Sequence, residues 1–453
     1  MIIQIKDMER LKGILLVLII TTTSGFAQEG WTLQDCIDYA IENNIQLKRQ
    51  HLQSEIARNN FNQSRISLLP GLVAFANHDF NSGRALNYET YQWENREFEQ
   101  GNIGMESRLN LFNGFQNYNN IQQQRFLLLS SLEQFEKAMN DISLNISAAF
   151  FQILLDKELV EIAEFQVEVS SLELESARSN FLVGNISRGR VLEIESQLAA
   201  DQYQLTLARN NLGSSYLVLM HMMQMDPDHD FRVARPEIVE IDESAILNTV
   251  ENIYVEAEAN LPQVRGAEYF LKSRERELAI TRGQLSPSLA LRGLFYSRYS
   301  ELATDPIDGG NYPYATQIKD NQYRQLGISL QIPIFTGWST RNRISNARVS
   351  VLDAQYRLDE TRQNLYSEVH QMHNDAKNAY NRYISAEKAV LAAQESFQYA
   401  KEQFGLGLIN FVDYQYAQSS LYRARSNMAQ AKYEYYLRSK ILDFYIGQPL
   451  ALN

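Results

Sequence analysis

Cysteine is nearly absent from this chain, and basic residues are too few to balance the acidic ones. Cys36 is the only cysteine among 453 residues, which excludes an internal disulfide. The 42 Lys and Arg residues face 54 Asp and Glu residues, so the formal net charge is −12. Such a chain has no basic patch that favours DNA or RNA, and we expect no nucleic-acid partner.

Motifs for catalysis and for bound cofactors are also missing. The sequence has no nucleophile motif, no Gly-rich phosphate loop and no HExxH. Two patterns invite a metal: LMHMMQM at 219–225, whose thioethers and imidazole suit Cu(I), and the pair His370 and His373 on one helical face. We interpret the methionines as apolar packing at a helix end and the histidines as isolated. We therefore predict no enzyme activity, no cofactor and no metal site.

Long apolar runs are confined to the N-terminus. Residues 1–27 predict a secretory signal peptide, because basic residues precede an apolar run from Leu11 to Ile20 and small residues stand before Gln28. A single anchor helix is the alternative, but the run is shorter than the ~20 residues that span a bilayer. No other run approaches that length, so any membrane-spanning part of the mature chain must be a β-barrel.

What the chain does contain is, first, strictly alternating segments. In QLGISLQIPIFTG, residues 325–337, every second residue is apolar, and a near copy spans 103–114. Such alternation predicts strands with one apolar and one polar face, as a membrane barrel has. The residues that we expect to face lipid are Ile103, Met105, Leu109, Leu111, Leu326, Ile328, Leu330, Ile332 and Ile334.

The second pattern is a coiled-coil seam with alternating steps of four and three residues. It runs from about Gly114 to Leu182 without a proline, and its only polar positions are Asp156 and Ser170. A helix of ~70 residues is on the order of 100 Å long. A glycine turn follows, and a second helix from about 190 to 225 runs back.

The whole order of elements occurs twice. A helix over 31–67, a weak strand over 72–80, a polar loop over 81–100, the strand near 103–112, the long helix, the turn and the returning helix make one set. The second set has a helix over 261–284, a strand from Leu289, a loop over 301–323, the strand at 325–337, a long helix, a turn and a final helix to about 445. The predicted repeats are residues 28–243 and 244–453.

Four strands in one chain cannot close a barrel, since the smallest membrane barrels need about eight strands and lipid does not tolerate open edges. Two copies give a barrel too narrow for transport, whereas three copies give twelve strands and a pore. We therefore expect a homotrimer in contact with membrane lipid. Its long helices exceed a bilayer and must project from it as a coiled-coil tube.

Together, this order of elements, the duplication and several motifs resemble the outer-membrane efflux protein (TolC) family. The motifs are WTLQDCIDYAIENN, LFNG and IFTG, and FLVGNIS and FGLGLINFVD, and the likeness covers about 28–450. The resemblance implies a mainly α protein with a small membrane β part: a trimeric channel-tunnel with a 12-stranded barrel and a long α-barrel. It also implies a barrel surrounded by outer-membrane lipid. Export through it is passive, in a tripartite efflux or type I secretion system with a periplasmic adaptor (membrane fusion protein) and an inner-membrane pump.

The resemblance assigns roles to residues near the turns. The adaptor-contacting tips are Val183, Gly184, Asn185, Leu406, Gly407 and Leu408. Asp413 falls where the family often has an aspartate ring at the periplasmic entrance, and the second ring position falls on Tyr416. The positions of the family's polar entrance lock fall on Phe404 and Ile409, so that lock is absent in its known form.

Two replacements for this lock remain open. Entrance closure here rests either on aromatic packing or on Arg188 and Arg190 pairing with Asp413.

A different function class is also open, namely a periplasmic coiled-coil adaptor or tether without a pore. Such a tether has no need of two strand pairs with apolar faces. The exported substrate is not encoded in these patterns.

Overall fold

The computed structural model describes residues 30–86, 91–227, 229, 231–236, 247–305, 307, 309–448 and 450. The predicted signal peptide lies outside these residues. The chain divides into two compact units. Unit 1 combines the described residues of Met1–Lys48, Ala138–Ala257 and Tyr366–Asn453, and unit 2 combines those of Arg49–Lys137 and Glu258–Leu365. Each unit therefore draws on both predicted repeats.

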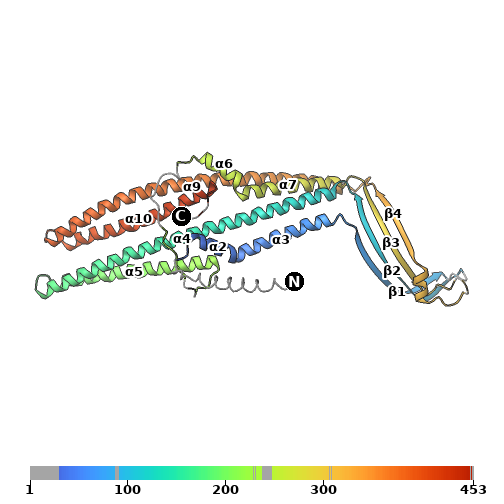
Figure 1. Cartoon of the computed structure of the whole chain (residues 1–453), viewed down its shortest axis with the longest axis horizontal. Helices are drawn as coiled ribbons and strands as arrows, with labels where there is room; N and C mark the ends of the chain where they lie inside the picture. Colours follow the sequence, from blue (N-terminus) through green and yellow to red (C-terminus); the bar gives the residue numbers. More distant parts are fainter. Residues whose placement is uncertain are drawn as a thin grey trace, which may run out of the picture. The chain divides into compact units, whose positions relative to one another are not determined.

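Unit 2 contains an antiparallel sheet whose strands lie side by side in chain order (Figure 1). The strands are β1 (Gly71–Leu86), β2 (Trp93–Phe112), β3 (Ser288–Ser300) and β4 (Tyr323–Gln331). The strands predicted near 72–80 and from Leu289 are confirmed. The predicted loop over 81–100 is wrong in most of its length, because β1 and β2 continue as a paired ribbon to Leu86 and Trp93. Both faces of this ribbon are exposed to solvent, so its side chains are polar and show no apolar alternation. The sequence pattern therefore gave no sign of the paired strands.

The strand predicted at 325–337 is shorter than its alternating pattern. β4 ends at Gln331, and Ile332 and Ile334 lie beyond it. Pro333 has no N–H to donate to a ladder, which explains why pairing stops here although the apolar alternation continues. The expectation that Ile332 and Ile334 are strand residues is therefore wrong.

A register shift interrupts β2 near its end. The pairing with β3 moves from Asn110–Ala290 to Phe112–Leu289, so Leu111 is the extra residue of a bulge. Phe112, and not Leu111, therefore stands opposite Leu289. Leu111 does not continue the alternation of β2, in contrast to the prediction.

A short helix interrupts the predicted loop over 301–323. This helix, α8 (Tyr314–Asp320), is held against β3 through Gln317, whose side chain is buried. The Gln317 amide accepts from the Ser300 N–H (3.0 Å) and donates to the carbonyls of Ser300 (3.0 Å) and Tyr312 (2.6 Å). One polar side chain thus fixes α8 on the sheet.

Eight longer helices complete the described fold: α2 (Leu33–Asn43), α3 (Ile45–Ile66), α4 (Gln116–Leu182), α5 (Arg188–Met223), α6 (Val250–Asn260), α7 (Pro262–Gly283), α9 (Ser339–Gly405) and α10 (Phe411–Tyr445). The long helices α4 and α9 each have 67 residues and begin 223 positions apart. The short helices α2 and α6 each have 11 residues and begin 217 positions apart. Element lengths thus recur between the two halves of the chain, and α6 is an element that the pattern did not predict.

The predicted helix over 31–67 is two helices that meet at Asn44. The side-chain oxygen of Asn44 (Oδ1) accepts hydrogen bonds from the backbone N–H groups of Gln46 (2.8 Å) and Leu47 (3.2 Å), and so caps α3. Its amide group donates to the Met222 carbonyl at the end of α5 (3.0 Å). The break therefore follows from a side chain that serves two helix ends.

The core of unit 1 lies where α2, α5 and α10 meet the middle of α4. Met220, Met223 and Met225 are buried there, which agrees with apolar packing of the methionine run. Cys36 is also buried, and this burial, together with Asp35, raises the pKa of its thiol to about 12. Among the described helices, α4 alone is long and apolar enough to cross a membrane, but a core helix meets the same criteria and Phe150 of α4 is buried in this core.

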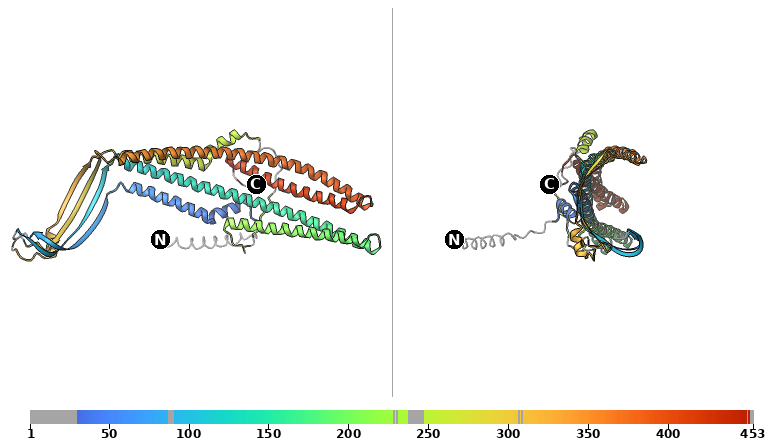
Figure 2. Two further views of the ribbon diagram at one scale, coloured as in Figure 1. Left: turned by 180° about the vertical axis from the view of Figure 1, so that it is seen from behind. Right: turned by 90° about the vertical axis from the view of Figure 1, so that its right-hand side faces the viewer.

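The two polar positions of the predicted seam each bond to α5. Ser215 donates to Asp156, and Ser170 donates to Asp201. All four side chains are satisfied, so these polar layers fix the register of α4 against α5 without leaving a buried group unpaired. α4 lies beside α5, and α9 beside α10, as far as the turns that join them (Figure 2).

Candidate functional site

The sheet register brings six of the nine predicted lipid-facing residues onto one face. Directly opposite residues of an antiparallel pair share a face. Met105 stands opposite Ala74 and Phe295, and Leu291 stands opposite Leu109 and Ile328. The apolar face contains Leu72, Ala74, Ala76, Ile103, Met105, Leu109, Leu289, Leu291, Phe295, Leu326, Ile328 and Leu330. Leu326 and Ile328 are 78% and 69% exposed.

The opposite face of the sheet, which we call the polar face, carries an ion pair and several amides beside Val73, Phe75 and Leu294. Arg292 of β3 pairs with both carboxylate oxygens of Glu106 in β2, at 2.7 and 3.0 Å. Gln325, Ser329 and Gln331 alternate along the same face of β4. The register thus gives the sheet one apolar and one more polar face, the pattern that a membrane barrel has.

The turns that end the two long helices have the same geometry. Gly184 and Gly407 have φ values of +81° and +73°, which glycine adopts without strain. Each donates to the carbonyl three residues earlier, Phe181 and Phe404, at 3.0 Å. The predicted tip residues Val183, Leu406 and Leu408 are exposed, as is Leu182. Each turn therefore presents apolar side chains to solvent.

Beside these turns, side chains of four helices meet in a cluster that we call the hairpin junction: Glu173 (α4), Arg190 (α5), Phe404 (α9), and Phe411 and Tyr414 (α10). The Arg190 guanidinium lies 3.8 Å from the ring centroid of Phe411 and 5.1 Å from that of Phe404. The rings of Phe404 and Tyr414 are stacked at 4.8 Å. The Tyr414 hydroxyl donates to Glu173. The junction thus ties the α4–α5 hairpin to the α9–α10 hairpin.

The contacts of the hairpin junction can be compared with the two predicted ways of closing the entrance, aromatic packing and an ion pair with Asp413. Arg190 pairs with Glu193 of its own helix (3.1 Å) while its guanidinium covers Phe411. No ion pair between Asp413 and Arg188 or Arg190 occurs among the described residues. Within this chain, the aromatic packing is the contact that forms.

Asp413 and Tyr416 lie on the exposed side of α10, one turn apart. Asn410 caps this helix by accepting the Asp413 N–H at 2.9 Å. Asp413 is in the first helical turn, where the helix dipole favours a carboxylate. The structure therefore leaves Asp413 and Tyr416 free for contacts outside this chain, whereas Phe404 and Ile409 pack in the junction's apolar cluster.

Burial determines the protonation of the junction carboxylate. Burial raises the pKa of Glu173, and the hydrogen bond from Tyr414 only partly offsets this. A carboxyl whose pKa is raised on folding stabilises the fold fully below its unfolded pKa of about 4.3, and this contribution is lost as pH rises through the raised value. Acid pH therefore strengthens the hairpin junction.

We expect a Glu173→Gln variant to remove this pH dependence. At pH ~4 the variant and the parent protein should have equal melting temperatures, because both side chains are neutral. As pH rises, the parent should melt progressively below the variant. Thermal unfolding followed by circular dichroism between pH 4 and 8 tests this, with Glu195→Gln as a control, since Glu195 is an exposed partner of Arg178. A constant difference across the pH range contradicts the assignment.

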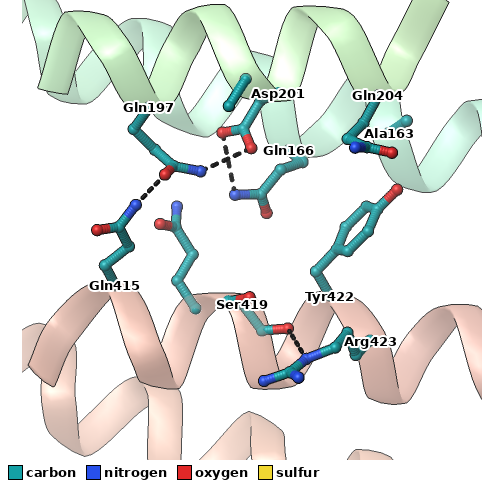
Figure 3. Close-up of a pocket in the computed structure, with 11 residues that line it drawn as sticks. Ala163, Gln166, Gln197, Asp201, Gln204, Gln415, Ser419, Tyr422 and Arg423 are labelled. Atoms are coloured by element: carbon teal, nitrogen blue, oxygen red, sulfur yellow. Dashed lines mark hydrogen bonds between the residues drawn. The ribbon is translucent and has the colours of Figure 1, made fainter. Parts of the chain in front are cut away.

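Further from the turns, a polar cavity of about 260 Å³ lies between α4, α5 and α10. Asp201 accepts from Gln197 at 2.8 Å and from Gln166 at 3.4 Å, and Gln415 of α10 donates to Gln197 (Figure 3). Gln418 also lines the cavity, and its buried Nε2 has no hydrogen-bond partner among the described residues. The sequence analysis missed this layer, because glutamines are ordinary residues on the surface of a helix.

Comparisons with known proteins agree with this architecture. A family model described as outer membrane efflux protein matches residues 36–223 and 253–448. Outer membrane protein TolC of Vibrio cholerae serotype O1 is 21% identical over 422 residues, covering 89% of this chain and 88% of that protein. Alkaline protease secretion protein AprF of Pseudomonas aeruginosa is 21% identical over 430 residues, covering 92% and 84%. The solved outer membrane protein VceC from Vibrio cholerae has the same fold, with a TM-score of 0.76 at 15% identity, covering 92% of this chain and 96% of that chain.

Proposed function

This chain belongs to the outer membrane efflux protein family, and from that premise we propose that three copies form a passive channel through the outer membrane. The channel carries small molecules or polypeptides outward from a periplasmic adaptor and an inner-membrane pump, and the pump supplies the energy. Either a tripartite efflux system or a type I secretion system provides these partners. A relative named for alkaline protease secretion supports the second setting.

The sheet carries the main argument for a trimeric barrel. β1 and β4 are its two edges, each paired on one side among the described residues. An apolar face of this kind requires lipid, and an edge in lipid requires a pairing partner. Pairing β4 of one copy with β1 of the next closes a twelve-stranded barrel with three copies. The polar face with Glu106 and Arg292 then lines the pore.

The tips are the proposed contact with the adaptor. Leu182 and Val183 of one turn and Leu406 and Leu408 of the other expose apolar side chains that are 84%, 71%, 75% and 70% accessible. Exposed apolar residues on a rigid turn suit the grooves of a partner's helical hairpins.

Reconstitution tests the channel directly. The mature protein should require detergent for extraction from membranes, and the purified trimer should conduct ions in planar lipid bilayers. A periplasmic tether without a pore predicts extraction by salt alone and no conductance. Either of those two results overturns the proposed channel.

We expect Asp413 to set the ion selectivity of the entrance. Three carboxylates around an axis attract cations and constrict the passage, so Asp413→Ala should weaken block by divalent cations about tenfold or more. Single-channel recordings with increasing divalent cation measure this effect. Glu402→Ala, which removes an exposed carboxylate from α9, is the control and should leave the block unchanged. Unchanged conductance and block in Asp413→Ala contradict the ring.

A further inference from the structure

Helix α8 lies on the apolar face of the sheet. The Ser297 hydroxyl donates to the Ile318 carbonyl at 2.7 Å, and the ring of Tyr314 meets that of Tyr299 at 4.9 Å. Ser297 stands opposite Ile103, so α8 covers the same face that carries Ile103. This is the face that the proposed function places in lipid.

The level of α8 coincides with a change in strand composition. On one side of it, the strands alternate apolar and polar residues, as in Ile103–Phe112. On the other side, β1 and β2 continue alone beyond the Gln100–Ser300 pair, with the polar sequences NSGR and ENREFEQ. Tyrosines gather at this boundary, as they do where membranes meet water. Helix α8 therefore marks the outer edge of the apolar band.

An open groove runs beside α8 on this face, with a volume of about 500 Å³. It is hollow because two short side chains of β1 stand next to longer ones of β2 and β3. Its apolar lining consists of Ala74, Phe75, Ala76, Ile103, Met105, Phe295 and Ile318, with Gly104 between them. A groove of this chemistry, continuous with a lipid-facing surface, suits a hydrocarbon chain.

A cation stands at the rim of the groove. Arg324 is opposite Phe295, and its guanidinium lies 5.8 Å from the Phe295 ring centroid. Arg324 is exposed and has no ion pair among the described residues. Lys319 is exposed on α8, while the neighbouring Asp320 accepts a hydrogen bond from the Tyr312 hydroxyl at 3.1 Å. Arg324 therefore places one positive charge at the rim of the groove, while the carboxylates nearby, Glu99 and Glu301, lie beside Tyr299.

We propose that this groove binds one acyl chain of an anionic lipid of the outer leaflet, and that Arg324 holds the phosphate of its headgroup. The inference rests on the proposed function, because that function orients the apolar face toward lipid. The bound lipid fills the hollow left by the alanines and anchors α8 at the membrane surface.

Photolabelling of the reconstituted full-length trimer tests the groove. The probe is phosphatidylglycerol with a diazirine on one acyl chain, mixed into phosphatidylcholine vesicles. Peptide mapping should find the label concentrated at Ala74, Ala76, Ile103 and Met105, relative to Leu326 and Ile328 on the same face. An even distribution over the face overturns the proposal.

Matched variants separate the two parts of the site. Ala76→Phe fills the groove and should abolish the local enrichment, whereas Leu72→Phe, on the same strand and face but outside the lining, should retain it. Arg324→Gln should keep the acyl labelling but reduce the preference for phosphatidylglycerol over an equally labelled phosphatidylcholine about fivefold. Wild-type enrichment in Ala76→Phe, in a variant that still conducts, contradicts the groove.

The outcomes also separate this inference from the proposed channel. A protein that conducts ions and is labelled evenly on its apolar face keeps the channel and loses the groove. Label on the polar face, at Ser329 or Gln331, or a failure of the trimer to insert, overturns the orientation of the sheet and with it the channel.

Discussion

An Ile328→Arg substitution should abolish assembly in the outer membrane. Ile328 lies in the middle of β4, opposite Leu291, on the apolar face. An arginine at the midplane of a barrel's lipid face costs about 2–4 kcal/mol, and a trimer contains three such sites. We expect the amount of inserted, heat-modifiable trimer to fall more than about tenfold, as measured by semi-native electrophoresis of membrane fractions.

The neighbouring residue provides the matched control. Ser329 precedes Leu330 on the same strand but points to the polar face, so Ser329→Arg places the same charge in the aqueous lumen. This variant should insert normally and change only ion selectivity. If both variants insert equally well, the assignment of the two faces is wrong, and with it the membrane barrel. The same conclusion follows if insertion of both variants falls to the same degree.

The features predicted from the sequence are those that depend on one periodic property. Alternation in β2 and β4 and the heptad seam of α4 are both repeated choices between apolar and polar residues, and such choices determine which face is buried. Ile328 and Leu330 could therefore be placed on an apolar face before any coordinates were known. The same reasoning found Gly184 and Gly407, because a helix hairpin requires a turn.

The features that were missed depend on a single long-range contact. α8 forms where Gln317 bonds to Ser300, and the helix break at Asn44 depends on the Met222 carbonyl. Neither contact leaves a periodic trace in the sequence. The end of β4 has a different, local cause: Pro333 lacks an N–H donor, although the apolar alternation continues past it. An amphipathic pattern predicts which face of an element meets water and which meets apolar groups. It does not predict which polar side chain lies opposite a given residue in another element.

The polar layers of unit 1 illustrate the same limit. Ser170 is an exception to the apolar pattern of the seam, and its hydroxyl donates to Asp201 of α5. Burial also raises the pKa of Asp201. Through Gln197 this carboxyl is linked to Gln415 of α10, so the layer joins both hairpins. The half-buried Glu173 and the buried Asp201 thus both lie where the hairpins meet.

A Phe411→Ala substitution should open the periplasmic entrance. Phe411 is buried in the hairpin junction, with Arg190 over one face of its ring and Tyr414 beside it. Removing a buried phenylalanine costs about 3–5 kcal/mol. If the junction forms only when the hairpins are closed against each other, even a third of this cost raises the resting open population about tenfold. Single-channel recordings of the purified trimer measure the open fraction.

The partner residue tests whether the ring acts through Arg190. A cation on an aromatic face contributes about 0.5–2 kcal/mol, so Arg190→Gln should open the entrance less than Phe411→Ala does. The double variant should add little to Phe411→Ala, because both changes remove the same contact. Phe165→Ala is the matched control: Arg425 of α10 lies 5.3 Å from this exposed ring of α4, away from the turns. The resting conductance of Phe165→Ala should equal that of the parent protein. If Phe165→Ala opens the entrance as much as Phe411→Ala does, general weakening of the helices, and not the hairpin junction, controls the entrance.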